Sequence, residues 1–191
     1  MRNASVARKT KETDIEAMLK LDGGAVEIET GVGFFDHMLH AMAAHAGWGL
    51  RLRCAGDLAV DDHHSVEDCG IVLGQALGQA LGDKGGLARF GQASIPMDES
   101  LATAAVDVSG RAFLVFDAHF SQAYAGLFQL CLCEEFFRAF AVNAGITLHL
   151  RLVYGANGHH EAESLFKAAA HSLRRALQPL EGTLSTKGSL A

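Results

Sequence analysis

Two copies of one short pattern of histidine and carboxylate side chains are the part of this 191-residue chain best suited to chemistry. The pattern is His-His-x-x-Glu, and its copies are His63-His64-Ser65-Val66-Glu67 and His159-His160-Glu161-Ala162-Glu163. At the His and Glu frequencies of the chain, only about 0.03 chance matches are expected. Two matches therefore indicate a duplicated site.

Imidazole and carboxylate groups at this spacing predict metal ligands. Glu67 follows the two histidines by four and three residues, so on a helix it can approach either ring. Neighbouring histidines point about 100° apart on a helix, or to opposite faces of a strand, so they are poorly placed to bind one ion together. Two pairs therefore predict two ions, each taking one histidine from a pair and sharing ligands between halves or subunits. Such ligands suit manganese, zinc, iron and nickel alike.

Further residues near the two motifs are candidates for the same site. His37, which follows Asp36, is expected to be an additional ligand, whereas His171 is expected to be structural or exposed. Carboxylates behind a metal ligand often orient its ring nitrogen. The acidic residues expected in that role are Asp61, Asp62 and Asp68.

The elements that must position these residues also repeat along the chain. Apolar periodicity predicts helices over 34–46, 65–81, 127–141 and 161–177, and strands that include 50–54, 57–60, 101–108, 112–116 and 146–153. Glu67 and Glu163 are 96 residues apart, as are His63 and His159. The sequence therefore predicts an α+β fold made by internal duplication, in which two similar half-domains each have a mixed or antiparallel sheet covered by helices. We expect one domain, 1–191, with pseudo-repeats at about 1–93 and 94–191.

One expected helix carries glycine at every fourth position, at Gly70, Gly74, Gly78 and Gly82. Each interior glycine costs about 0.5–1 kcal/mol relative to alanine. The stripe therefore predicts close approach of another helix or strand. It is not a phosphate-binding loop, because no Gly-Lys-Ser/Thr follows it.

Composition narrows the class of protein. A hydrophobic content of 49% with 20% charged residues is typical of a folded globular chain. The net charge of −6 argues against nucleic-acid binding. No apolar run approaches the roughly 18–20 residues of a membrane helix, and the polar run Lys11-Glu12-Thr13-Asp14 stands where a signal peptide would be apolar. We therefore expect a cytoplasmic protein that binds neither nucleic acid nor membrane, with its four cysteines as buried free thiols.

Considered together, the motifs of this chain resemble those of the imidazoleglycerol-phosphate dehydratase family. The motifs rich in metal-ligand residues are Asp36-His-Met-Leu39 followed by His45, Asp61-Asp-His-His64 with Glu67, and His159-His160 with Glu163. The other matching motifs are Lys11-Glu-Thr13, Lys84-Gly-Gly-Leu-Ala-Arg-Phe-Gly91, Pro96-Met-Asp-Glu99, Asp107-Val-Ser-Gly-Arg111 and Ser185-Thr-Lys-Gly188. They occur in the order of the family and cover roughly residues 8–188.

The resemblance implies a reaction, a fold and an assembly. The reaction is loss of water from imidazole glycerol phosphate, a small phosphate substrate, to give imidazole acetol phosphate in histidine biosynthesis. The fold is ribosomal protein S5 domain 2-like. The protein would be a lyase with two Mn²⁺ ions per subunit, or other divalent transition metals. It would assemble as a homo-oligomer of 24 subunits built from trimers, with metal sites at subunit contacts.

The resemblance also implies a role for each matching residue. The metal ligands would be His37, His63, His64, Glu67, Glu135, His159, His160 and Glu163. The catalytic residues would be Glu12, Glu67 and Glu163, with Glu12 as acid/base in contact with the substrate. His45 and Lys167 would line the substrate pocket, and the phosphate would be held by Arg89, Arg111, Ser185 and Lys187. Glu135 departs from the family, which usually has histidine there, but glutamate can also bind manganese.

Two other functions are compatible with the same ligands. One is a dinuclear metal-dependent hydrolase of a small phosphate ester, with Glu12 as the base that activates water. The other is a metal-bound assembly that has lost catalysis because of Glu135. The presence of Glu12 together with the arginine and lysine positions favours the dehydratase.

Overall fold

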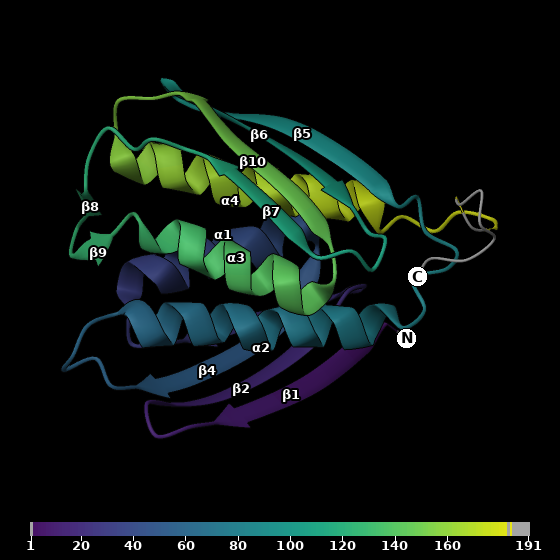
Figure 1. Cartoon of the computed structure of the whole chain (residues 1–191), viewed down its shortest axis with the longest axis horizontal. Coiled ribbons are helices and arrows are strands. Elements are labelled where there is room, and N and C mark those ends of the chain that lie inside the picture. The colour runs from purple at the N-terminus through teal and green to yellow at the C-terminus, as the bar shows by residue number, and fades with distance from the viewer. Residues whose placement is uncertain (1, 183, 185–191) are drawn as a thin grey trace.

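The computed structural model describes residues 2–182 and 184 of the chain. Two four-stranded sheets form the outer layers, and four long helices fill the space between them (Figure 1). In the described part of the chain, no helix has both the length and the apolar character needed to cross a membrane.

The first half of the chain builds one sheet and two helices. Its elements are β1 (Asn3–Lys9), β2 (Thr13–Lys20), β3 (Gly23–Glu29), α1 (Gly33–Ala46), β4 (Trp48–Gly56) and α2 (His63–Leu81). The strand order is β1-β2-β4-β3, with β3 and β4 parallel and the other pairs antiparallel. Alternation along β2 places Ile15, Ala17 and Leu19 in the core, beneath the helices.

The second half repeats this plan. Its elements are β5 (Phe90–Met97), β6 (Ser100–Asp107), β7 (Phe113–Asp117), β8 (Tyr124–Ala125), β9 (Phe128–Gln129), α3 (Leu132–Ala144), β10 (Thr147–Tyr154) and α4 (Gly158–Ala176). The strand order is β5-β6-β10-β7, with β7 and β10 parallel. The two sheets thus have the same order and the same single parallel pair, which confirms the predicted α+β duplication.

Three local expectations from the sequence were wrong. Residues 57–60 form a turn, closed by the Val60 amide donating to the Asp57 carbonyl at 2.8 Å, and not a strand. Residues 127–131 precede α3, because the short β8–β9 hairpin turns there at Gly126 with φ of 62°. Cys131 is exposed, whereas the other three cysteines are buried free thiols as expected.

Two glycines of the stripe, Gly70 and Gly74, pack closely against α3, as predicted, whereas Gly82 follows the end of α2 and has no atom within 4 Å of an added Cβ. A Cβ atom added at Gly70 would lie 2.6 Å from the Phe136 carbonyl oxygen, and one added at Gly74 would lie 2.6 Å from that of Phe140. Side chains larger than hydrogen would therefore force the helices apart. Beside this contact, the rings of Phe136 and Phe166 stack with centroids 5.4 Å apart in the core.

Candidate functional site

Both His-His-x-x-Glu motifs lie at the start of a helix, α2 or α4, with their histidines in the first turn. Each turn is preceded by a side chain that accepts a hydrogen bond from the first histidine amide. Asp61 Oδ1 accepts from His63 N at 2.8 Å, and Asn157 Oδ1 accepts from His159 N at 3.0 Å. Such caps satisfy amides that a helix start leaves unpaired. The helices therefore begin two or three residues earlier than expected, which brings all four histidines onto helical geometry.

This geometry separates the histidines of each pair, as expected. In each pair the rings are 6.1 Å apart and nearly perpendicular, at 84° for His63 and His64 and 79° for His159 and His160. The first histidine of each pair faces the glutamate four residues later. The separation is 3.6 Å from His63 Nε2 to Glu67 Oε2 in α2, and 3.2 Å for the equivalent atoms in α4.

The tightest group of potential ligands joins the two halves of the chain. His37 of α1 and the pair His159 and Glu163 of α4 each offer one ligand atom, and these three atoms lie within 4.8 Å of one another. His37 Nε2 is 3.4 Å from Glu163 Oε2. Within the described residues, no other His, Cys, Asp and Glu side chains gather three ligand atoms this closely.

The Glu163 carboxylate is held ionised inside this group. Its side chain is only 8% exposed, and burial by itself would raise its pKa. Lys167, one turn later, donates from Nζ to the other carboxylate oxygen at 2.7 Å. Together with His37, this ammonium group lowers the pKa of Glu163 below its ordinary value. One oxygen therefore binds the lysine, while the other faces the two imidazoles.

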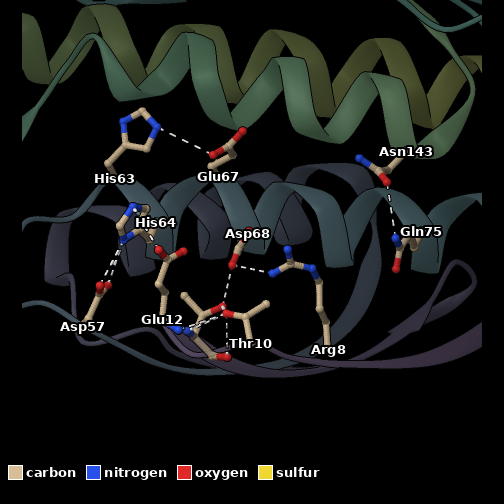
Figure 2. Close-up of polar contacts among 11 residues, drawn as sticks. Arg8, Thr10, Glu12, Asp57, His63, His64, Glu67, Asp68, Gln75 and Asn143 are labelled. Atoms are coloured by element: carbon tan, nitrogen blue, oxygen red, sulfur yellow. Dashed lines mark hydrogen bonds and ion pairs between the residues drawn. The ribbon is translucent and has the colours of Figure 1, made fainter.

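The second histidine of each motif is held through Nδ1 by a carboxylate. His64 Nδ1 donates to Asp57 Oδ2 at 3.1 Å, and this hydrogen bond raises the pKa of His64 (Figure 2). His160 Nδ1 donates to Glu99 Oε2 at 2.8 Å, which raises the pKa of His160 and lowers that of Glu99 to about 2. In both rings Nε2 is left as the atom available to a ligand. Glu12 Oε1 lies 4.0 Å from Nε2 of His64.

Sequence reasoning did not find these two orienting carboxylates. Asp57 and Glu99 hold the rings, whereas the expected Asp61 caps its helix. Asp68 contacts neither ring and binds an arginine and a threonine instead. Glu99 belongs to the matching motif Pro96-Met-Asp-Glu99, but the sequence assigned no role to it.

Glu135 stands apart from the tight group. It lies in the first turn of α3, and its side chain, 36% exposed, has its Oε2 3.8 Å from Arg138 Nε. The tight group therefore contains three of the eight predicted ligands. The other five lie outside it: His63, His64, Glu67, Glu135 and His160.

The predicted phosphate-binding arginines converge on one carboxylate. Arg89 Nε donates to Asp107 Oδ1 at 2.7 Å, and Arg111 donates to Oδ2 of the same residue at 3.1 Å. Arg89 also donates to the Leu184 carbonyl oxygen at 2.5 Å. The other two predicted phosphate ligands, Ser185 and Lys187, lie outside the described residues.

The predicted pocket residues His45 and Lys167 lie on facing helices, α1 and α4. His45 Nδ1 is 3.0 Å from Nε2 of His171, so His171 contacts a predicted pocket residue from a half-buried position. Burial is the main cause that lowers the pKa of both imidazoles. Glu163, Lys167 and His171 follow one another at intervals of four residues, so they form a polar stripe facing α1.

The duplicated α+β scaffold, with imidazole and carboxylate groups gathered at helix starts, defines a candidate metal-binding enzyme as the general class. Comparison with known proteins gives the family. The sequence profile of the imidazoleglycerol-phosphate dehydratase family matches residues 30–173. The chain belongs to the imidazoleglycerol-phosphate dehydratase family, and the prediction of a hydro-lyase is thereby confirmed.

Individual relatives resemble the chain over its whole length. It is 53% identical over 195 residues to imidazoleglycerol-phosphate dehydratase from Cereibacter sphaeroides (strain ATCC 17029 / ATH 2.4.9) and 54% identical over 194 residues to that from Streptococcus sanguinis (strain SK36), with all of each chain covered. The crystal structure of the Staphylococcus aureus enzyme matches with a TM-score of 0.85 and 41% identity, over 93% of this chain and 99% of that one. The Pyrococcus furiosus enzyme, in complex with (S)-C348, matches with a TM-score of 0.86 and 37% identity, over 97% and 100%.

Proposed function

We propose that the protein converts imidazole glycerol phosphate to imidazole acetol phosphate, a step of histidine biosynthesis, with a dinuclear metal site. The observation that carries the metal site is the group of His37, His159 and Glu163, whose ligand atoms lie within 4.8 Å of one another. Membership of the family supports the reaction. We further propose that the two halves act as one dehydratase domain in the cytoplasm.

The donor set fits a divalent transition metal. Two imidazole nitrogens and an ionised carboxylate suit Mn²⁺, and equally other ions that accept nitrogen and oxygen ligands. A histidine that binds metal almost always gives its other ring N–H to a carboxylate or carbonyl group. His64 and His160 follow this rule through their Nδ1 atoms. This second observation supports both histidines as Nε2 ligands.

The remaining predicted ligands would complete two Mn²⁺ sites between subunits. His63, Glu67 and Glu135 lie outside the tight group of one chain, which supports contributions from neighbouring copies. A homo-oligomer of 24 subunits built from trimers would bring these ligands together. When bound, the metal supplies Lewis-acid stabilisation of negative charge on the imidazole ring of the substrate. Glu67 and Glu163 would serve as ligands in contact with the reacting groups.

The proton transfer is assigned to Glu12. The proton to be removed is bound to the second carbon from the imidazole ring, the carbon whose hydroxyl oxygen becomes the ketone oxygen, and it is not acidic in water. Glu12 would accept it, the hydroxyl group on the carbon beside the ring would leave as water, and the resulting enol would become the ketone product. A positioned carboxylate contributes roughly 10²–10⁴-fold to such a step.

Phosphate recognition is assigned to the arginine pair held by Asp107. Two guanidinium groups beside one carboxylate concentrate positive charge, and the Arg111 side chain is 70% exposed, so this position suits a dianionic phosphate. Ser185 and Lys187 would add donors. His45 and Lys167 would line the adjoining part of the pocket.

An assay of the purified protein with imidazole glycerol phosphate and Mn²⁺ tests the proposal, with the ketone product and inorganic phosphate measured separately. We expect the ketone with no phosphate release, and a turnover about 10²–10⁴-fold lower in Glu12→Gln with its metal content unchanged. Glu16→Gln is the matched control, because Glu16 is exposed on β2, the strand that follows Glu12, and should keep full activity.

Two outcomes would contradict the dehydratase. Release of phosphate without ketone would establish a phosphate-ester hydrolase. Full metal uptake without turnover of the substrate would establish a metal-bound assembly that has lost catalysis.

A further inference from the structure

Glu12 lies on a turn whose backbone is ordered by its own side chains. The turn joins β1 to β2, and the Thr10 amide donates to the Thr13 carbonyl at 2.8 Å. Thr10 Oγ1 accepts hydrogen bonds from the amides of Glu12 and Thr13, at 3.1 and 3.0 Å. These bonds fix the shape of the turn, but they do not fix its distance from the helix that carries His64.

Asp68 connects this turn to the helix that carries His64. It follows Glu67 on α2, and Figure 2 shows the two carboxylates leaving the helix in different directions, with Asp68 directed toward the turn. Its Oδ2 accepts from Thr13 Oγ1 at 2.5 Å and from an Arg8 nitrogen at 2.5 Å. The Asp68 side chain is 10% exposed, and Thr13 is 3% exposed. Strands β1 and β2 are thus joined to α2 by one buried carboxylate.

The described residues of the second half do not repeat this arrangement. The residue that follows Glu163 is Ser164, which donates back to its own helix at the Glu161 carbonyl. The equivalent turn is held instead through its own carboxylate, because Glu99 accepts from Ser100 and from His160. Asp68 is therefore an anchor specific to the half that carries Glu12.

We propose that Asp68 is a positioning residue, which holds the turn at the distance from α2 that places the Glu12 carboxylate for proton transfer. This inference rests on the proposed function. Among the described groups, the nearest partner of that carboxylate is His64 Nε2 at 4.0 Å, beyond hydrogen-bond length. The position of Glu12 therefore depends on its backbone. A displacement of about 1 Å at a reacting group can cost on the order of 10²-fold in rate.

Kinetics of variants around Asp68 test the proposal. Asp68→Asn and Thr13→Val should lower kcat about 10- to 100-fold, with KM and Mn²⁺ content close to the wild-type values. Thr13→Ser should retain the wild-type kcat, because serine keeps the hydroxyl group that Asp68 binds. Asp22→Asn is the control, because Asp22 pairs with Arg2 at the other end of the same two strands.

Two further measurements separate positioning from general destabilisation. If Asp68 acts through Glu12, Asp68→Asn should cause no further loss of kcat in a Glu12→Gln background. Amide hydrogen exchange of residues 10–13 should be at least about tenfold faster in Asp68→Asn, with residues 63–67 unchanged.

Several results would overturn the proposal: kcat of Asp68→Asn within twofold of wild type, an equal loss in the Glu12→Gln background, loss of bound Mn²⁺, or unchanged exchange at residues 10–13. Failure of the proposed function is a different result, namely no ketone product from the wild-type protein. In that case hydrogen exchange alone decides whether Asp68 holds the turn.

Discussion

An alanine at Gly74 should force apart the two helices that carry Glu67 and Glu135. The added Cβ would lie 2.6 Å from the Phe140 carbonyl oxygen and 2.9 Å from Asn143 Cβ. One of these atoms belongs to the α3 backbone and the other is fixed to it, so rotation of a side chain cannot relieve the contact. The helices must separate, and the hydrogen bond from Gln75 to Asn143, at 3.3 Å, would lengthen with them.

The expected change in the free energy of unfolding of Gly74→Ala is the sum of two opposing effects. Replacing a helical glycine by alanine favours the helix by about 1 kcal/mol. Overpacking a tight contact costs about 1–3 kcal/mol, and two approaches below 3.0 Å put Gly74→Ala at the upper end. Gly74→Ala should therefore lower the free energy of unfolding by about 2 kcal/mol. Gly78→Ala is the matched control one turn later, because its nearest atom would be 3.4 Å away. Gly78→Ala should raise the free energy of unfolding by about 0.5–1 kcal/mol.

Thermal unfolding at one fixed protein and Mn²⁺ concentration measures both variants. For a chain of this size, 1 kcal/mol shifts the Tm by roughly 2–4 °C. Gly74→Ala should therefore unfold about 4–8 °C below wild type, whereas Gly78→Ala should unfold slightly above it. Equal Tm values for the two variants, or a lower one for Gly78→Ala, would refute the conclusion that close helix approach explains the glycine stripe.

Three further predictions concern the metal and the histidines. Glu135→His should shift metal preference from Mn²⁺ toward Zn²⁺ or Ni²⁺, because imidazole replaces a carboxylate; unchanged relative affinities in competition would contradict Glu135 as a ligand. Chelation should release ligands shared between subunits and give smaller oligomers by light scattering, and an unchanged mass after verified metal loss would contradict shared sites. His45 and His171 have lowered pKa values, so their stabilising effect should be complete above the ordinary value of 6.5 and lost as pH falls through their native pKa values. The Tm of His171→Phe should accordingly depend less on pH below 6.5 than that of wild type, and equal pH dependences would show that this pair does not control the effect.

The repeated fold was readable from the sequence because its signals are local. Apolar periodicity and a constant offset between the two motifs indicated two similar halves, and the glycine spacing indicated a close helix contact. Helix starts were misplaced by two or three residues because Asp61 and Asn157 cap the helices from positions that the apolar pattern does not mark. The segment 57–60 alternates like a strand, but Val60 is 68% exposed and the Asp57 carboxylate is bound to His64.

Which side chains contact one another within the site could not be predicted from the sequence, because these contacts depend on the tertiary structure. His37 and Glu163 were both named as ligands, yet their 3.4 Å approach follows from the packing of α1 against α4, across 126 residues of chain. The contact of His45 with His171 spans the same distance in sequence and was missed for the same reason. No spacing rule within one element could indicate either contact.

The differences between the halves bear most directly on the chemistry. The duplication repeats the ligand motif, but it does not repeat the carboxylate that orients its second histidine. In the second half that carboxylate is Glu99, on the turn between β5 and β6, and the pKa of about 2 makes it a poor acceptor of a proton from carbon. In the first half the ring of His64 is held by Asp57, which lies after β4. Glu12, on the turn between β1 and β2, is therefore not needed to hold that ring. This division of tasks is the physical reason to assign proton transfer to Glu12 rather than to its counterpart.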